Sequence, residues 1–119
     1  MPVATKYVFI ASMDVAPEKE ALFNEVYDTE HVPNLLQVPG VRSVTRLRTE
    51  PASVNIGGEQ KPVTGEGAPT YTAIYEIDSP EVLTSEAWAQ AVELGRSPSE
   101  VRPFTSNRHH IVRKVMSLP

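Results

Sequence analysis

Hydrophobic and polar residues recur along the chain with two spacings, and these predict four strands and two helical regions. Residues 7–13 form an apolar run rich in aromatic and β-branched residues, which is typical of a strand buried on both faces. Residues 41–49 and 70–77 alternate with a period of two, and residues 107–116 form a last candidate strand. In the second strand Arg42, Arg46 and Arg48 share one side, so we expect a wet, basic face and an edge position.

The first helical region covers residues 18–30, behind Pro17 as a first helical residue. At about 100° per residue, one arc of this helix carries the apolar side chains Leu22, Phe23, Val26 and Tyr27. Pro33 lacks an N–H group and its ring clashes with the preceding turn, so we expect the helix to end before it. A short separate turn over residues 33–36 then follows.

The second helical region opens with a turn over residues 80–83. Ser85 is placed to cap a further helical segment that runs to Leu94 and that Gly95 ends. The apolar stripe of this segment consists of Trp88, Ala91 and Val92.

The order strand, helix, strand, strand, helix, strand predicts an α+β fold of the ferredoxin-like βαββαβ type. In this fold a four-stranded antiparallel sheet carries two helices on one face. We expect one domain over residues 1–119, with a long flexible loop over residues 50–69 between strands two and three. The loop is rich in glycine and proline, and its role as a lid, a dimer arm or a disordered segment stays open.

The central strands carry apolar side chains on both faces, whereas the helices cover only one face. Large exposed apolar patches are rare on soluble monomers. We therefore expect a homodimer that pairs through the open sheet face.

Composition narrows the classes of partner. The 119 residues carry a net charge of −4, which argues against nucleic acid or an anionic membrane as the main partner. No stretch approaches the ~20 apolar residues of a membrane span. The absence of cysteine excludes disulfides and thiolate catalysis, and we expect a cytoplasmic protein.

The run Phe-Asn-Glu-Val-Tyr-Asp-Thr-Glu-His-Val-Pro-Asn-Leu-Leu-Gln-Val-Pro-Gly-Val over residues 23–41 resembles the helix-to-strand signature of EthD-like proteins. Residues 73–77 and 102–108 resemble the second half of such proteins, so the resemblance spans nearly the whole chain apart from the loop. It implies a dimeric α/β barrel, with antibiotic-biosynthesis-type monooxygenases, muconolactone isomerases and aromatic polyketide cyclases as relatives. It further implies that His31 points into a cavity between sheet and helices.

His31 is the first catalytic candidate. It stands at the flank of the buried arc, and an imidazole titrates near neutral pH, which suits general acid/base catalysis. An equally weighted alternative is a histidine that only caps the free carbonyls of the helix end.

Glu30 is the second candidate, because a helical wheel of residues 18–30 places its carboxyl group on the same side as the apolar residues of this helix. There it would orient His31 or act as a base with a raised pKa. The favoured alternative is that Glu30 accepts the free N–H groups of the turn at residues 33–36. Asp28 is placed to pair with His31 at the surface or to be solvated.

Four aromatic residues are candidates for a substrate pocket, although core packing is the commoner role of such side chains: Phe23, Tyr27, Tyr75 and Trp88.

The last strand holds adjacent histidines and a basic cluster. His109 and His110 must point to opposite faces, so they cannot form one metal site, and we expect no metal. Arg108, Arg113 and Lys114 are expected to be solvated, with an acidic ligand, a phosphate or the partner subunit as alternatives. No phosphate loop or dinucleotide fingerprint is present, so we expect no cofactor.

These observations favour a small-molecule-binding protein that is a cofactor-independent enzyme of the isomerase, cyclase or lyase type. Its substrate would be a small apolar or aromatic carbonyl compound. The alternatives are a non-catalytic binder of small molecules, a cofactor-free monooxygenase, and a haem-binding protein that uses His31 or a last-strand histidine.

Overall fold

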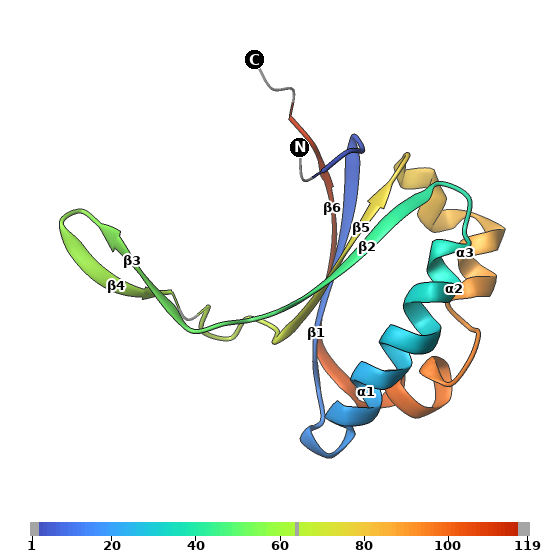
Figure 1. The fold of residues 1–119 in the computed structure, drawn as a ribbon, viewed down its shortest axis with the longest axis horizontal. Helices are drawn as coiled ribbons and strands as arrows, with labels where there is room; N and C mark the ends of the chain where they lie inside the picture. Colours follow the sequence, from blue (N-terminus) through green and yellow to red (C-terminus); the bar gives the residue numbers. More distant parts are fainter. Residues whose placement is uncertain (1–2, 64, 117–119) are drawn as a thin grey trace.

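The computed structural model describes residues 3–63 and 65–116. Four antiparallel strands form one sheet in the order β2-β5-β1-β6, where β1 is Tyr7–Val15, β2 is Val41–Arg48, β5 is Tyr71–Ile77 and β6 is Thr105–Lys114. The helices lie on one side of this sheet (Figure 1). This arrangement confirms the predicted ferredoxin-like fold, with β1 and β5 in the centre and β2 at an edge.

The first helical region is longer than the sequence predicted. Helix α1 (Glu20–Val26) continues through a π-helical segment, Tyr27–His31, into helix α2 (Val32–Leu36) without a break. The N–H of Val32 donates to the carbonyl of Tyr27, five residues earlier, so the turn before Pro33 is widened. The expectation that Pro33 ends the helix is therefore wrong, because the wider turn accommodates the ring that a regular α-turn would exclude.

The second helical region follows its predicted start. A 3-10 turn over Pro80–Thr84 precedes helix α3 (Glu86–Ala91), and the Ser85 hydroxyl accepts the N–H of Trp88 at 3.2 Å. The predicted cap is thus confirmed, although α3 itself ends before Leu94. Two further turns, Ser97–Val101 and Arg102–Phe104, lead the chain into β6.

The alternation along β5 divides the sheet into a helix-covered face and an open face. Tyr71, Ala73, Tyr75 and Ile77 are buried under the helices, whereas the residues between them are half-buried. Val44, Arg46 and Arg48 of β2 pair with Tyr75, Ala73 and Tyr71, so they share the covered face. Arg46 is the exception to the predicted wet, basic side of β2, because its side chain is held beneath α1 and is only 20% exposed. The side chains of Arg42 and Arg48 are 63% and 66% exposed, as that prediction requires.

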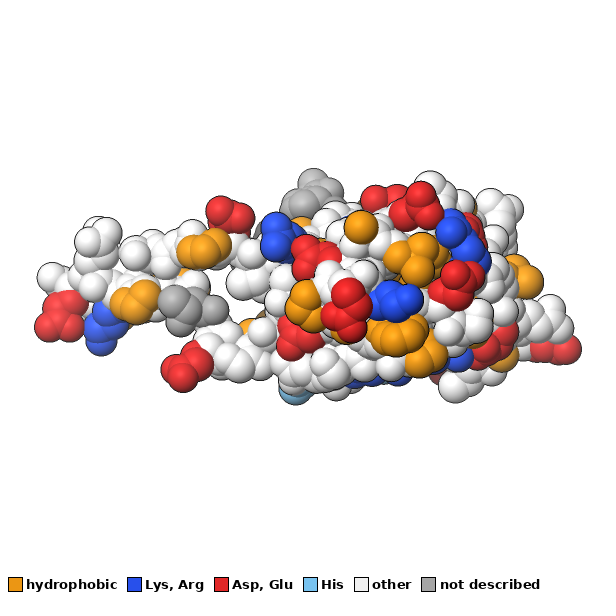
Figure 2. Space-filling model, turned by 90° about the horizontal axis from the view of Figure 1, so that it is seen from below, with side chains coloured by type: hydrophobic (Ala, Val, Ile, Leu, Met, Phe, Trp, Pro, Cys, Tyr) orange, Lys and Arg blue, Asp and Glu red, His pale blue; other side chains and the backbone are white. Residues whose placement is uncertain are grey.

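The segment predicted as a loop contains a β-hairpin. Strands β3 (Ala52–Ile56) and β4 (Glu59–Val63) pair across Gly57 and Gly58, whose positive φ angles of 62° and 79° allow a tight two-residue turn. This hairpin arm projects from the sheet on the side opposite the helices (Figure 1), and apolar side chains are exposed on it (Figure 2).

The core lies between the sheet and the helices in two adjoining clusters. The larger one includes Leu35, Tyr75 and Ile77, and the smaller one includes Phe23, Val26 and Val101. No helix within residues 3–63 and 65–116 is long and apolar enough to cross a membrane.

Candidate functional site

A cavity of about 350 Å³ opens between the helix-covered face of the sheet and the helical segments. Strands β1, β5 and β6 form its floor, and the π-helical segment, α2, α3 and the turns after α3 form its walls. Its lining residues are Phe9, Ala11, Met13, Tyr27, His31, Leu35, Tyr75, Trp88, Val92, Glu93, Ser97, Val101, Arg102, Thr105, Arg108 and His110.

His31 lies on the cavity wall with only 8% of its surface exposed. Its ring packs on the Tyr27 ring at a centroid distance of 4.6 Å, and its Nδ1 atom has no hydrogen-bond partner among the described residues. Burial, helped by the nearby charge of Arg102, lowers the pKa of His31 from 6.5 to about 4. The side chain is therefore a neutral imidazole at pH 7, and its unpartnered Nδ1 atom is itself buried.

Two buried phenols line the same cavity. The Tyr27 hydroxyl donates to the sulfur of Met13 at 3.5 Å, which is a weak interaction, and the Tyr75 hydroxyl forms no hydrogen bond within the described residues. Burial raises the pKa of both tyrosines. Both therefore remain protonated at neutral pH and can donate a hydrogen bond to an oxygen atom in the cavity.

Aromatic rings supply the apolar part of the wall. Trp88 packs edge-on against Phe9 and Tyr75 at centroid distances of 5.8 and 5.6 Å. A flat apolar molecule can stack or pack edge-on against such rings.

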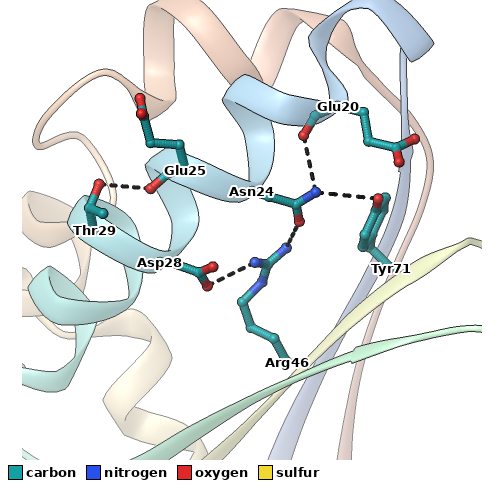
Figure 3. A network of polar contacts seen from close by, with 7 residues as sticks. All are labelled: Glu20, Asn24, Glu25, Asp28, Thr29, Arg46 and Tyr71. Carbon is teal, nitrogen blue, oxygen red and sulfur yellow. Dashed lines mark hydrogen bonds and ion pairs between the residues drawn. The ribbon is translucent and has the colours of Figure 1, made fainter.

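Tyr27 is held from behind by Arg46, which lies outside the cavity. The Arg46 guanidinium lies 5.1 Å from the Tyr27 ring centroid and donates to Asp28 at 2.9 Å and Asn24 at 2.8 Å (Figure 3). This network ties β2 to α1 and fixes the ring on which His31 packs. It also places Asp28 against Arg46 and not against His31, and the Asp28 side chain is 64% exposed, which agrees with the alternative of a solvated aspartate.

Glu30 has a different role from those expected. Its carboxylate accepts the side-chain Nε–H of Arg96 at 2.6 Å and the backbone N–H of Arg96 at 2.9 Å. Hydrogen bonds from Arg96 lower the pKa of Glu30, so it is not a base with a raised pKa, and it does not cap the turn at residues 33–36. The contact requires Gly95, because a Cβ there would lie 2.5 Å from Glu30 Oε1.

The other sequence candidates divide between the cavity and the core. Tyr27, Tyr75 and Trp88 line the cavity, whereas Phe23 lies behind Tyr27 in the core at a centroid distance of 4.6 Å. His110 faces the cavity and contacts Phe9, whereas His109 is not part of the lining.

Three charged residues of the described chain line the cavity, of which Arg102 and Glu93 had no signal in the sequence pattern, while Arg108 belongs to the basic cluster of the last strand. Arg102 donates to both carboxylate oxygens of Glu93, at 3.0 and 3.1 Å, so these two charges offset each other. Arg108 stands on β6 two residues before His110, and strand alternation alone would have placed it on the same face. Within residues 3–63 and 65–116, no group of three or more His, Cys, Asp or Glu side chains is arranged to hold a metal ion.

Comparison with known proteins identifies the fold. No protein-family model matches the sequence, and a search of curated proteins finds no significant match. Among solved structures, an EthD family protein from Bacillus halodurans aligns with a TM-score of 0.56 and 17% identity, covering 92% of this chain and 99% of that one.

Two further structures align over 95% of this chain. The haem-degrader MhuD from Mycobacterium tuberculosis, with two haems in its active site, gives a TM-score of 0.59 at 14% identity over 99% of its own chain. SnoaB, a cofactor-independent oxygenase from Streptomyces nogalater, gives 0.58 at 15% identity over 96% of its chain. The chain thus has the ferredoxin-like fold of EthD and dimeric α/β-barrel proteins, and similarity at this level establishes the fold alone.

Proposed function

We propose that this protein binds a small aromatic carbonyl compound in the cavity and catalyses a cofactor-independent proton transfer on it. The observation that carries the proposal is the buried, neutral His31 imidazole on the wall of an aromatic cavity, whose buried Nδ1 atom has no hydrogen-bond partner among the described residues. A buried polar atom without a partner costs about 1–3 kcal/mol, so a rotation of the ring that brings this nitrogen to a ligand would remove that cost.

In the proposed reaction, neutral His31 removes a proton from the carbon next to the substrate carbonyl. The electrons of the broken C–H bond form an enolate, and His31 returns the proton to another carbon, so that the substrate is isomerised with no net gain or loss of atoms. Although a pKa of about 4 describes a weak base, a negative charge forming beside the imidazole raises that pKa during the step.

The protonated phenols of Tyr27 and Tyr75 are suited to donate hydrogen bonds to the enolate oxygen. Their raised pKa values keep the protons on the tyrosines, and the aromatic surroundings strengthen each hydrogen bond by excluding water. Glu30 has no part in this scheme, because its carboxylate is engaged by Arg96.

Ligand binding can be measured directly, because Trp88 is the sole tryptophan of the chain and lines the cavity. We would titrate phenols, lactones and aryl ketones against Trp88 fluorescence, and follow by NMR the exchange of ligand C–H protons for deuterium from the solvent. Exchange that His31→Gln abolishes and His109→Gln retains supports catalysis. Binding without exchange in the wild type supports the non-catalytic binder, and absence of binding contradicts the proposal.

A second candidate is a cofactor-free monooxygenase, which the shared fold with the oxygenase SnoaB favours. Oxygen uptake with an electron-rich phenol distinguishes this reaction from proton transfer.

Haem should be tested as a ligand as well, because MhuD shares the fold and a neutral imidazole can ligate iron. A Soret shift that disappears in His31→Gln would indicate a haem site.

We also propose that the protein is a homodimer that pairs through the open sheet face. Ile10, Ile74 and Ile111 are cross-strand neighbours there, and the hairpin arm extends on the same side of the sheet. One face of the arm carries the exposed apolar side chains Val54, Ile56 and Val63. A two-stranded hairpin is marginally stable by itself, so packing on a second copy would stabilise it.

Sedimentation measurements test this dimer. Ile111→Glu places a charge on the open face and should yield monomers, whereas Leu94→Glu changes an exposed residue next to the helices and should leave the mass unchanged. A wild-type protein that is monomeric at high micromolar concentration would contradict the proposal.

A further inference from the structure

Arg108 is the charge of the cavity that nothing else in the described chain offsets. Arg102 is paired with Glu93, and desolvation lowers the pKa of both wall histidines, the buried His31 and the exposed His110. Arg108 also lines the cavity but forms no hydrogen bond or ion pair with any residue in 3–63 or 65–116. Arg108, an exposed residue of β6, is therefore the one positive charge of the cavity lining without a protein partner in residues 3–63 and 65–116.

The backbone of β6 is built so that Arg108 faces the cavity. Thr105 and Arg108 both line it, although residues three apart point to opposite faces of a regular strand. The register of β1 and β6 shifts between Ser12 and Asp14, and Asn107 has a φ of 50° in this bulge. The extra residue of the bulge puts Thr105 and Arg108 on the same face, while Arg108 stays in regular alternation with His110.

The bulge is held in place by side-chain contacts. The Asn107 amide donates to Asp14 Oδ2 at 3.1 Å and to the carbonyl of Gly67 at 3.0 Å. Asparagine is among the few residues that tolerate this backbone conformation. Arg108 is thus aimed by a supported local structure and not by a loose chain end.

The field of Arg108 reaches the polar groups of the cavity. Its charge is the largest electrostatic influence that opposes the rise in the Tyr27 pKa caused by burial, and it helps to lower the pKa of His110. An anion among these side chains would meet a positive potential, strengthened by the low polarity of the aromatic walls.

We propose that the ligand of this cavity is an aromatic carboxylate, whose carboxylate group pairs with the guanidinium of Arg108 while its ring packs against Trp88 and Tyr75. This inference rests on the proposed small-molecule function and adds the charge of the substrate class. Arginine suits this role because its planar guanidinium can donate two parallel hydrogen bonds to one carboxylate.

Matched ligand pairs separate the charge from the ring. Phenylacetate and phenylacetamide, and cinnamate and cinnamamide, would be titrated by calorimetry and by Trp88 fluorescence. The variants are Arg108→Gln, Arg108→Lys, and Lys114→Gln, which removes a charge from the same strand outside the cavity lining. Thermal unfolding confirms that each variant is folded.

The wild type should prefer each carboxylate over its amide by about tenfold or more, the range of a charge-assisted hydrogen bond. Arg108→Gln should abolish that preference and leave amide binding unchanged, Arg108→Lys should restore part of it, and Lys114→Gln should retain it.

Two results would overturn the inference in different ways. Equal binding of acid and amide by the wild type, unaffected by Arg108→Gln, refutes the carboxylate while the cavity function stands. Failure of every ligand to bind refutes both. A change in dimer dissociation in Arg108→Gln without any change in carboxylate binding would assign Arg108 to the subunit interface instead, and would also overturn the inference.

Discussion

Acidification should destabilise the folded protein through His31 before the carboxylates titrate. A histidine of the unfolded chain has a pKa near 6.5, and burial lowers the pKa of His31 to about 4 in the folded protein. Between these values the unfolded chain binds a proton that the folded protein does not. The stabilisation is therefore fully present above pH 6.5 and is lost as the pH falls towards 4.

The magnitude follows from the two pKa values. At about 1.4 kcal/mol per pH unit, the gap between 6.5 and about 4 corresponds to about 3 kcal/mol in total. About 2 kcal/mol of this should be lost between pH 7 and pH 4.5. Such a loss is a large fraction of the stability of a typical small domain.

Urea unfolding followed by Trp88 fluorescence at several pH values between 7 and 4.5 measures this loss. His31→Gln removes the titrating group, so its free energy of unfolding should fall by about 2 kcal/mol less than that of the wild type over this range. The hydrogen-bonded carboxyl groups of Asp14 and Glu76 have lowered pKa values and lose their contribution mainly below this range, equally in both proteins.

His110→Gln serves as the matched control, because the pKa of His110 is also lowered but its side chain is more exposed. Parallel stability curves for the wild type and His31→Gln would refute the reasoning. They would mean that His31 takes up its proton at an ordinary pH in the folded protein, and that it is not the neutral imidazole on which the proposed catalysis depends.

Four substitutions test the structure that surrounds the site, each by chemical denaturation. Ser85→Ala removes the cap of α3 and should cost about 1 kcal/mol. Gly95→Ala adds a Cβ at a φ of 70° against Glu30, and should cost about 1–2 kcal/mol. Arg46→Met removes two hydrogen bonds and a cation–π contact and should also cost about 1–2 kcal/mol. Asn107→Val forces a β-branched residue into a left-handed conformation and should cost about 2 kcal/mol. A loss below about 0.5 kcal/mol in any of them would contradict the contact concerned.

Regular periodicity was sufficient to predict the sheet and its strand order. The buried alternation of β5 and the Ser85 cap appear where the pattern placed them, because strand period and capping are local properties of the sequence. The hairpin arm also has a local signal, since Gly57 and Gly58 stand between alternating residues, and a glycine pair in that context indicates a two-residue turn. This signal was not recognised, because the high glycine and proline content of residues 50–69 is also typical of an irregular loop.

The roles of Glu30 and Asp28 depend on contacts with residues far away in the sequence, which hydrophobic periodicity does not predict. The wheel placed Glu30 in the apolar arc, but a chain segment 66 residues away supplies Arg96, which keeps the carboxylate ionised. In the same way, no feature of the sequence around Asp28 predicts that Arg46 is its partner. A single sequence contains no local signal for such pairs, so the role of a carboxylate on an amphipathic helix cannot be read from the helix alone.

Three of the side chains proposed to act on the ligand stand where the backbone departs from regular geometry. Tyr27 and His31 begin and end a π-helical segment, and Arg108 lies in a bulge. The cavity-lining residues Ser97 and Val101 begin and end a second π-helical segment after α3. Segments of both kinds occur often at functional sites, and each costs regular hydrogen bonding or backbone freedom. Core packing alone does not require several such departures around one cavity, whereas a site that must direct an imidazole and a guanidinium at one ligand does. Asn107→Val disfavours the left-handed conformation that supports the bulge, so it should also weaken carboxylate binding, even though Asn107 is not part of the cavity lining.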